Sequence, residues 1–268
     1  MTTHPSIDEL LYTDLDGNSG ADPDEVVLLA DEDDRHLERV PALVALMEDT
    51  AAKPYDRFQA CYALARWAEQ AGYDAVIAAA SAPAAVVWSD YSIDRFYSTD
   101  DTFAQLADAV GSSDELAERK GTEELRLTAL RALIRIADQV YFERNLEYAL
   151  DRRTLPAVLD EIPPVVRRGA GRIADRVRDR LPFDLAAQLA GLVSAVTPVD
   201  EALAVRLADA LVDTDPGDRA LTELTGLVNR GATPASLDLA ERLRYSGSAD
   251  VRQAVADALR NRDLRSRG

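Results

Sequence analysis

The chain has 268 residues, of which 48 are acidic and 30 basic, so its net charge is −18, and its 47% hydrophobic content suffices for a substantial core. No apolar stretch reaches the ~18 residues that a membrane span needs, and the polar, acidic start is unlike a secretory signal peptide. The single cysteine, Cys61, excludes an intrachain disulfide, so we expect a reducing, cytoplasmic location.

The charge is distributed unevenly along the chain. Residues 1–118 hold 25 acidic and 6 basic residues, net −19, whereas the remainder is close to neutral. A field of that sign repels nucleic acid and anionic membranes and speeds the encounter with a basic partner. We therefore expect a basic protein as partner, with nucleic acid and membrane disfavoured. Solubility, or adaptation of a whole proteome to salt, explains the same charge without any partner.

Residues 1–34 form an acidic leader, for which we expect short helices at 6–13 and 24–30. The segment between them, Asp14–Glu25, resembles an EF-hand calcium loop because side-chain oxygens fall at loop positions 1, 3, 5, 9 and 12. Position 6, where that family has glycine, is Ser19, and position 8, usually aliphatic, is Ala21. Accidental spacing of acids in so acidic a leader is the alternative, and we assign no metal site.

From residue 36 onward a helical period dominates. Apolar residues recur at three- and four-residue spacing in 36–50, 55–71, 102–110, 123–142, 154–179, 183–195, 199–212, 217–230, 234–245 and 249–260. Glycine, proline and serine breakers separate these segments, among them Gly72 and Gly111-Ser112-Ser113. Alternating β-branched runs are nearly absent, so we expect an all-α chain, either a bundle or a solenoid.

One arginine-anchored stripe recurs in four of the predicted helices. Small or apolar residues follow the arginine at +3, +6 and +7, after Arg57, Arg126, Arg167 and Arg252. Two of these helices come after a proline-containing helix, Val40-Pro41-Ala42-Leu43 or Leu155-Pro156-Ala157-Val158-Leu159.

These residues resemble the HEAT-repeat family over about 36–70, 100–140, 154–180 and 234–262. The resemblance implies an α-α superhelix of about five to six helix pairs over residues 35–268, with an insertion near 81–101. Arrays of this family mostly present surfaces to partners.

The insertion is rich in aromatic and acidic residues. Aromatic anchors beside acids are typical of binding hot spots, which makes these residues candidates for contact with a basic partner: Trp88, Asp90, Tyr91, Asp94, Phe96, Tyr97, Asp100 and Asp101. The alternative is that the aromatic residues fold the insertion onto the helices as a small satellite core.

A basic stripe occupies one face of a later helix. Arg168, Arg172, Arg176 and Arg180 stand four residues apart and form a weaker candidate anion-binding site. Pairing with Asp175 and Asp179, a solvated face, or docking against the acidic first half of the chain explains the stripe without a ligand. Gly169-Ala170-Gly171 in the same helix indicates close helix packing rather than a phosphate loop.

Catalytic patterns are scarce. His4 and His36 are the only histidines, and Cys61 lies on a face predicted to be packed, so we assign no catalytic residue and no cofactor. We expect a non-catalytic protein-binding solenoid, and its most concrete form is an immunity or antitoxin protein that masks a basic toxin. The alternatives are a nucleic-acid-acting protein similar to HEAT-like alkylpurine DNA glycosylases, using the arginine helix 167–180, and a chromophore lyase of HEAT type.

Overall fold

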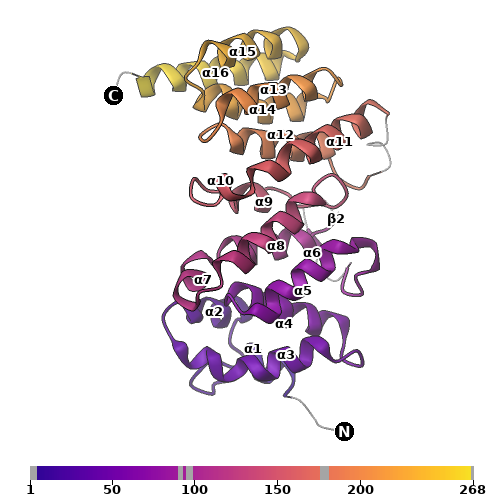
Figure 1. Ribbon diagram of the computed structural model, residues 1–268, viewed down its shortest axis with the longest axis vertical. Helices are drawn as coiled ribbons and strands as arrows, with labels where there is room; N and C mark the ends of the chain where they lie inside the picture. The colour runs from indigo at the N-terminus through magenta and orange to yellow at the C-terminus, as the bar shows by residue number, and fades with distance from the viewer. Residues whose placement is uncertain (1–4, 90–92, 95–98, 176–180, 267–268) are drawn as a thin grey trace. The chain divides into compact units, whose positions relative to one another are not determined.

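The computed structural model describes residues 5–89, 93–94, 99–175 and 181–266 (Figure 1). The described residues are mainly helical, which confirms the predicted all-α class. The chain divides into two compact units, which we call unit 1 (residues 1–133) and unit 2 (residues 134–268). The acidic leader, expected to end near residue 34, belongs to unit 1, where its helices pack on those that follow it.

Unit 1 begins with short helices and continues with longer ones. Its elements are α1 (Ile7–Leu11), α2 (Pro23–Leu28), the 3-10 helices η1 (Leu29–Asp31) and η2 (Asp34–Arg39), α3 (Val40–Glu48), α4 (Pro54–Arg66), α5 (Gln70–Ser81), the 3-10 helix η3 (Pro83–Ala85), the antiparallel strands β1 (Ile93–Asp94) and β2 (Thr99–Asp100), α6 (Thr102–Gly111) and α7 (Asp114–Lys120). Helix α8 (Glu123–Arg135) crosses the division between the units.

Helix α4 is the centre of unit 1, because α1, α3, α5 and α6 all pack against it. The leader is held in place by Arg39, whose guanidinium donates hydrogen bonds to the carbonyls of Leu10 (2.6 Å), Thr13 (2.7 Å) and Asp14 (2.5 Å). Trp67 at the end of α4 is fully buried and donates from its indole nitrogen to the Val27 carbonyl at 2.9 Å. The leader is therefore an integral part of the core of unit 1.

Two helices of unit 1 differ from the prediction. Helix α5 was not expected, because its alanine-rich sequence carries little contrast between an apolar and a polar face. Gly72, predicted as a breaker, lies inside this helix: a Cβ there would come within 2.3 Å of the Ala65 nitrogen and 2.5 Å of the Leu64 carbonyl carbon. Gly72 is thus a close-contact residue that lets α5 start against α4. Helix α7 was also missed, since it follows a breaker and has only seven residues.

Unit 2 begins with short helices and continues with longer ones. Its elements are α9 (Asn145–Tyr148), α10 (Leu155–Val158), the 3-10 helix η4 (Leu159–Glu161), α11 (Ile162–Ala174), α12 (Leu185–Val196), α13 (Glu201–Val212), α14 (Asp218–Arg230), α15 (Pro234–Ser246) and α16 (Ala249–Ser266). The segment 154–179, predicted as one helix, is divided where Pro163 and Pro164 start α11.

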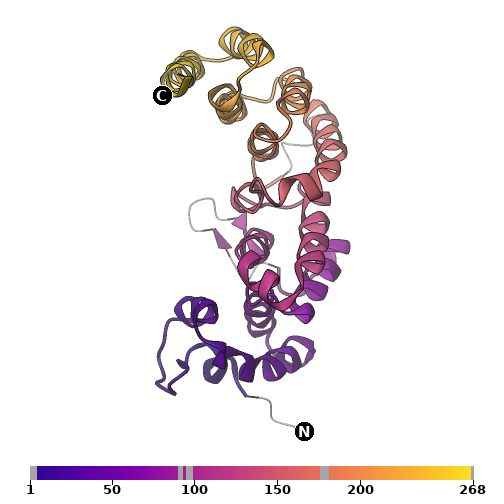
Figure 2. The same ribbon diagram turned by 60° about the vertical axis from the view of Figure 1, so that its left-hand side comes forward.

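The long helices of unit 2 form two layers. Helix α14 contacts α12 and α16 in one layer, and α13 contacts α11 and α15 in the other, as Figure 2 shows with these helices nearly end-on. Gly169 in α11 allows close packing, because a Cβ there would lie 2.2 Å from Cδ1 of Leu189 in α12, as the sequence predicted. The sequence aligns α11 and α16 by Arg167 and Arg252, but these two helices lie in opposite layers. Helices one or more whole pairs apart would lie in the same layer. The 85 residues between the two arginines therefore do not correspond to a whole number of helix pairs.

Three of the aligned arginines share one structural role. Each donates a hydrogen bond to a backbone carbonyl at the end of a preceding helix: Arg57 to Met47 (2.9 Å), Arg126 to Val110 (2.9 Å) and Arg252 to Gly247 (3.0 Å). These carbonyls have no partner within their own helix, so the arginines stabilise helix ends. In α11 this role belongs to Arg168, which donates to the Arg135 carbonyl at 2.7 Å, one residue after the arginine that the stripe predicted.

Candidate functional site

The predicted partner-binding residues fall into two groups. Trp88, Asp94, Asp100 and Asp101 belong to the described part of the chain, and the side chain of Asp94 is not described. The others lie outside the described residues: Asp90, Tyr91, Phe96 and Tyr97.

Trp88 packs against helix α4. Its side chain is half-buried, and its ring centroid lies 6.0 Å from that of Phe58. The hydroxyl of Thr102, at the start of α6, lies 3.5 Å from the Trp88 carbonyl. For this residue the structure therefore favours the satellite-core interpretation, in which an aromatic residue holds the insertion on the helices.

Asp100 and Asp101 are neighbours with different surroundings. Asp100 accepts hydrogen bonds from the backbone nitrogen (3.1 Å) and the hydroxyl (2.6 Å) of Thr102, so its Oδ1 is used at the start of α6. Asp101 is 8% exposed, and Gln105 donates to its Oδ2 at 3.3 Å. The other oxygen of Asp101, Oδ1, is buried without a hydrogen-bond partner. An unpaired buried carboxylate oxygen is costly, which marks Asp101 as a functional candidate.

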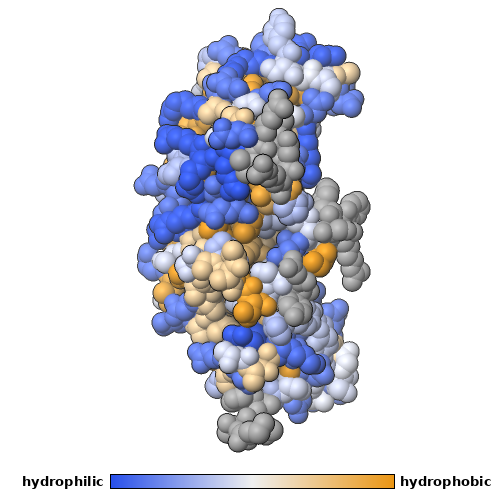
Figure 3. All heavy atoms as spheres, turned by 90° about the vertical axis from the view of Figure 1, so that its right-hand side faces the viewer, coloured by the Kyte–Doolittle hydropathy of each residue, from blue (hydrophilic) through white to orange (hydrophobic). Residues whose placement is uncertain are grey.

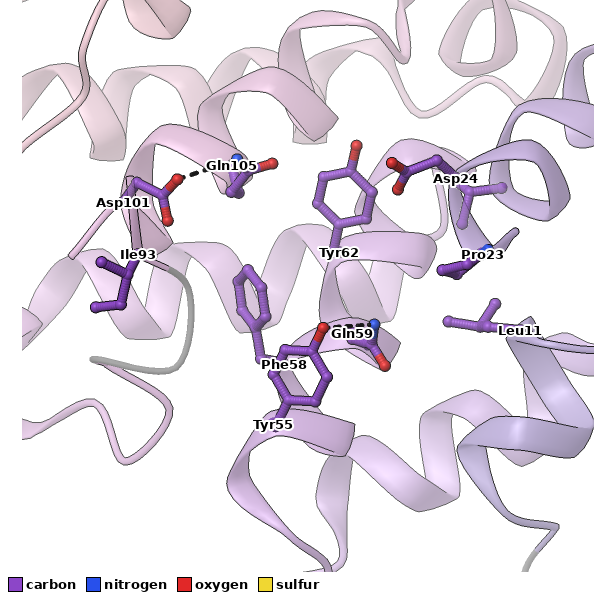
Figure 4. A pocket seen from close by; sticks show the side chains of 11 residues that line it. Leu11, Pro23, Asp24, Tyr55, Phe58, Gln59, Tyr62, Ile93, Asp101 and Gln105 are labelled. Atoms are coloured by element: carbon purple, nitrogen blue, oxygen red, sulfur yellow. Dashed lines mark hydrogen bonds between the residues drawn. The ribbon is translucent and has the colours of Figure 1, made fainter. Parts of the chain in front are cut away.

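Asp101 lines a cavity of about 550 Å³ within unit 1. We call this space the acidic cavity. Its walls come from α1, α2, α4, β1 and the start of α6, and the lining residues are Leu11, Pro23, Asp24, Val27, Tyr55, Phe58, Gln59, Tyr62, Ile93, Asp101 and Gln105. In Figure 4, the Asp101 carboxylate lies beside Gln105 on one side of the cavity, and Asp24 lies on another side. The aromatic side chains lie between them.

The wall from α4 carries most of the aromatic surface. Tyr55, Phe58, Gln59 and Tyr62 stand at positions i, i+3, i+4 and i+7, so they share one face of the helix. This spacing is visible in the sequence. The prediction for this helix, however, rested on the arginine-anchored stripe and did not include Tyr55, Phe58 or Tyr62 as binding residues. The amide nitrogen of Gln59 donates to the hydroxyls of Tyr12 and Tyr55, each at 3.0 Å, while its Oε1 is buried and accepts no hydrogen bond.

The lining residues of the acidic cavity include two carboxylates and no lysine, arginine or histidine. Burial, followed by the neighbouring Tyr12 and then Asp24, raises the pKa of Tyr55, and burial is also the main cause that raises the pKa of Tyr62. Asp108 adds to the effect on Tyr62, whose hydroxyl donates to its Oδ2 at 3.3 Å. Both phenols therefore stay protonated at neutral pH, and the walls offer acceptor oxygens and aromatic faces to a ligand.

Two further hollows differ in character. One, of about 490 Å³ in unit 1, runs along the alanines of α5 and is mainly apolar. Figure 3 shows moderately hydrophobic side chains gathered in the half of that view where unit 1 lies. The other, of about 440 Å³ in unit 2, is lined by Arg144, Arg152 and Arg230 together with Glu147 and Asp151. The acidic cavity is the one of these three without a basic lining residue.

The described part of the predicted arginine stripe is occupied by contacts within unit 2. Arg168 donates to Oδ1 of Asp138 at 2.8 Å, and Arg172 donates to the Asp138 backbone carbonyl. The Asp138 side chain is 4% exposed and also lies 3.7 Å from the Arg172 guanidinium. Arg176 and Arg180 lie outside the described residues. Arg168 and Arg172 therefore stabilise the packing of unit 2 through these bonds.

In the segment that resembles a calcium loop, the acidic side chains form hydrogen bonds within turns, an ion pair and a helix cap. Asp14 accepts hydrogen bonds from Asp16 and Asn18, Asp16 pairs with Arg35 at 2.8 Å, and Asp22 caps α2. Over the described ranges, no group of three or more histidine, cysteine, aspartate or glutamate side chains is arranged to hold a metal ion.

Cys61 is fully buried, and this burial raises the pKa of its thiol well above the ordinary value. A thiol in that state is a poor nucleophile, in agreement with the packed position predicted from the sequence.

Comparison of the chain with protein-family models, with curated proteins and with solved structures gives no match. None of the helices in the described ranges combines the length and the apolar character required to traverse a lipid bilayer.

Proposed function

We propose that this protein is a non-catalytic binding protein that captures a basic protein through unit 1. The observation that carries the proposal is the acidic cavity, where Asp24 and Asp101 face aromatic walls without a basic lining residue. A buried carboxylate oxygen that lacks a partner in the free protein gains one when a cationic group binds.

The distribution of charge supports the same partner. Unit 1 carries 27 acidic and 10 basic residues, net −17, whereas unit 2 carries 21 and 20, net −1. The attraction between unit 1 and a basic protein accelerates association and falls with ionic strength. Nucleic acid experiences the opposite force from this unit.

The finer form of the proposal is an immunity or antitoxin protein that masks a basic toxin in the cytoplasm. Its support is analogy from high acidity, modest size and helical architecture, together with the resemblance of the arginine-anchored helices to a HEAT-type solenoid. A solenoid would present unit 1 as an extended surface for such a partner.

The test is capture followed by a defined binding measurement. The full-length protein is immobilised and exposed to a native lysate of the organism that produces it, and retained proteins are identified by mass spectrometry. The partner is then purified and its Kd measured at about 50 mM and about 500 mM NaCl. We expect a basic partner whose affinity falls at least about tenfold at the higher salt concentration.

A matched pair of variants locates the interaction. The double variant Asp24→Asn/Asp101→Asn removes two charges from the acidic cavity, and Glu115→Gln/Asp114→Asn removes two from α7, outside the cavity lining. The purified partner is expected to lose affinity for the first variant and to retain it for the second. A partner that is acidic, or that binds independently of salt and of both variants, contradicts the proposal.

A further inference from the structure

The unpaired oxygen of Asp101 indicates which chemical group the acidic cavity lacks. Asp101 is more than nine-tenths buried, its Oδ2 is held by Gln105, and its Oδ1 accepts no hydrogen bond. A second buried acceptor, Oε1 of Gln59, is also without a donor on the α4 side of the same cavity. Both groups require a donor, and the negative charge of Asp101 and Asp24 favours a cationic one.

The aromatic walls narrow the choice of cation. Tyr55, Phe58 and Tyr62 contribute rings to one side of the cavity (Figure 4). A guanidinium group stacks on such rings, is more weakly hydrated than an ammonium group, and spreads five donors over a plane. It can therefore serve acceptors on different walls while its faces contact the rings. An ammonium group concentrates three donors at one point and pays more to leave water.

We propose that the acidic cavity receives an arginine side chain projecting from the basic partner, with Asp101 as its principal acceptor. This inference rests on the proposed function and specifies the group that the partner presents. Asp24 supplies the second carboxylate, and the rings of α4 hold the alkyl stem and the face of the guanidinium. The volume of about 550 Å³ accommodates the arginine side chain together with part of the backbone that carries it.

The experiment compares three blocked heptapeptides that differ only at the central residue, which is arginine, lysine or citrulline. Citrulline has nearly the shape of arginine without its charge. Each is titrated into the full-length, isotope-labelled protein at low salt, and NMR shift changes give both the Kd and the location. We expect the arginine peptide to bind about fivefold or more tightly than the lysine peptide and at least about tenfold more tightly than the citrulline peptide.

Single substitutions connect the preference to the cavity. Asp101→Asn keeps the shape of the side chain and is expected to weaken arginine-peptide binding about 10- to 100-fold. Tyr55→Leu removes a 39%-exposed ring at little cost to the core and is expected to weaken it about three- to fivefold. Glu115→Gln, which removes an exposed charge outside the cavity, is expected to leave the Kd within about twofold. The amide spectrum reports whether each variant is folded, and Asp24→Asn replaces Asp101→Asn if the latter is not.

The outcomes separate this inference from the proposed function. Equal binding of arginine and lysine peptides, with Asp101→Asn no worse than Glu115→Gln, overturns the arginine cavity but leaves capture of a basic partner intact. Absence of any arginine-dependent shift overturns it as well. A free arginine derivative, blocked at both ends, distinguishes a small-molecule site: if it binds as tightly as the peptide, the cavity is not a docking site for a protein partner.

Discussion

Two buried aspartates, one in each unit, differ in how their carboxylates are paired. In unit 2, Asp138 is 3% exposed and its carboxylate lies against Arg168 and Arg172. In unit 1, Asp101 is 8% exposed, and one of its oxygens receives only a long hydrogen bond from Gln105 while the other receives none. The first carboxylate is paired with two arginines, whereas the second has one oxygen without a hydrogen-bond partner.

The same contrast holds for the net charges of −17 and −1. Unit 2 pairs its acids with its arginines, for example Asp209 and Asp213 with Arg242. Unit 1 keeps an excess of acids that repel one another. Such repulsion destabilises a compact unit, so the apolar core of unit 1 has to offset it. Four predictions, in order of decreasing effect, test how far this contrast extends.

The largest expected effect concerns glycine in tight helix packing. Gly72→Ala places a Cβ against the backbone of α4 in unit 1, which cannot move aside, so we expect a loss of about 3 kcal/mol or more. Gly171→Ala in unit 2 enters open space within a helix and is expected to be neutral or stabilising by up to about 1 kcal/mol. Peptide-resolved hydrogen exchange measures both. Wild-type protection of α4 and α5 in Gly72→Ala would contradict the packing described.

The two aspartates provide the second prediction. Asp138→Asn weakens two ion pairs to partly exposed arginines, and we expect unit 2 to lose about 1–2 kcal/mol. Asp101→Asn removes an underpaired buried charge, so the stability of unit 1 is expected to stay unchanged or to rise by about 1 kcal/mol. Urea unfolding followed by hydrogen exchange distinguishes the units. Equal losses in both variants would show that Asp101 has a stabilising partner and would remove the contrast.

The third prediction is a pH dependence confined to unit 1. His36 is fully buried beside Lys120, whose Nζ lies 3.2 Å from its ring, and burial followed by the charge of Lys120 lowers the pKa of His36. The unfolded chain therefore binds a proton at a higher pH than the folded chain does. The stability of unit 1 should fall as the pH drops from about 6.5 toward the lowered pKa, by at most about 1.4 kcal/mol per pH unit.

The control for this pH dependence is His36→Gln, which removes the titrating group and should flatten the profile between about pH 6.5 and pH 5. Thermal unfolding over that range, with unit 2 as the internal reference, makes the comparison. A profile that keeps its slope in the variant would assign the effect to other groups.

The smallest expected effect concerns Glu201 of unit 2, whose two carboxylate oxygens both accept hydrogen bonds. Burial alone would raise the pKa of Glu201, but hydrogen bonds from the backbone of Ala232 (2.8 Å) and from the backbone (3.0 Å) and hydroxyl (2.6 Å) of Thr233 lower it to about 2. The stabilisation is complete above the unfolded pKa of about 4.5 and is lost as the pH falls toward 2.

At neutral pH, Glu201→Gln is expected to destabilise unit 2 by about 1 kcal/mol, because the carboxylate is partly exposed and solvent screens it. Thermal unfolding at pH 7 and at pH 3 measures the difference. A variant that is as stable as the wild type at pH 7 would show that the hydrogen bonds from Ala232 and Thr233 to Glu201 contribute nothing to stability.

Much of the helical structure could be predicted from sequence, and the failures have physical causes. The boundaries of α13, α14 and α15 follow the predicted segments closely, because each has breakers at its ends. Helix α5 is not predicted because alanine gives little contrast between its faces, and Gly72, predicted as a breaker, instead allows close contact between α5 and α4. Arg168 plays the same role as Arg57 because it lies close to the end of a preceding helix and donates to a carbonyl there. The spacing of residues in the sequence does not show this proximity.

The candidate site was only partly predictable. The sequence indicated Asp100 and Asp101 equally, but local hydrogen bonds occupy Oδ1 of Asp100 and leave Oδ1 of Asp101 without a partner. The aromatic wall at Tyr55, Phe58 and Tyr62 has a helical spacing that the sequence displays, yet nothing in the chain indicates which neighbour that face meets.

The sequence by itself determined the all-α class, the burial of Cys61 and the concentration of negative charge in the first part of the chain, because periodicity, side-chain polarity and charge are local properties. Only the tertiary structure decided that Leu11, Asp24, Tyr62 and Asp101 surround one cavity and that a carboxylate oxygen of Asp101 there lacks a hydrogen-bond partner. Contacts between residues far apart in sequence depend on how helix faces pack, and the helical period records that a face is buried without recording against what.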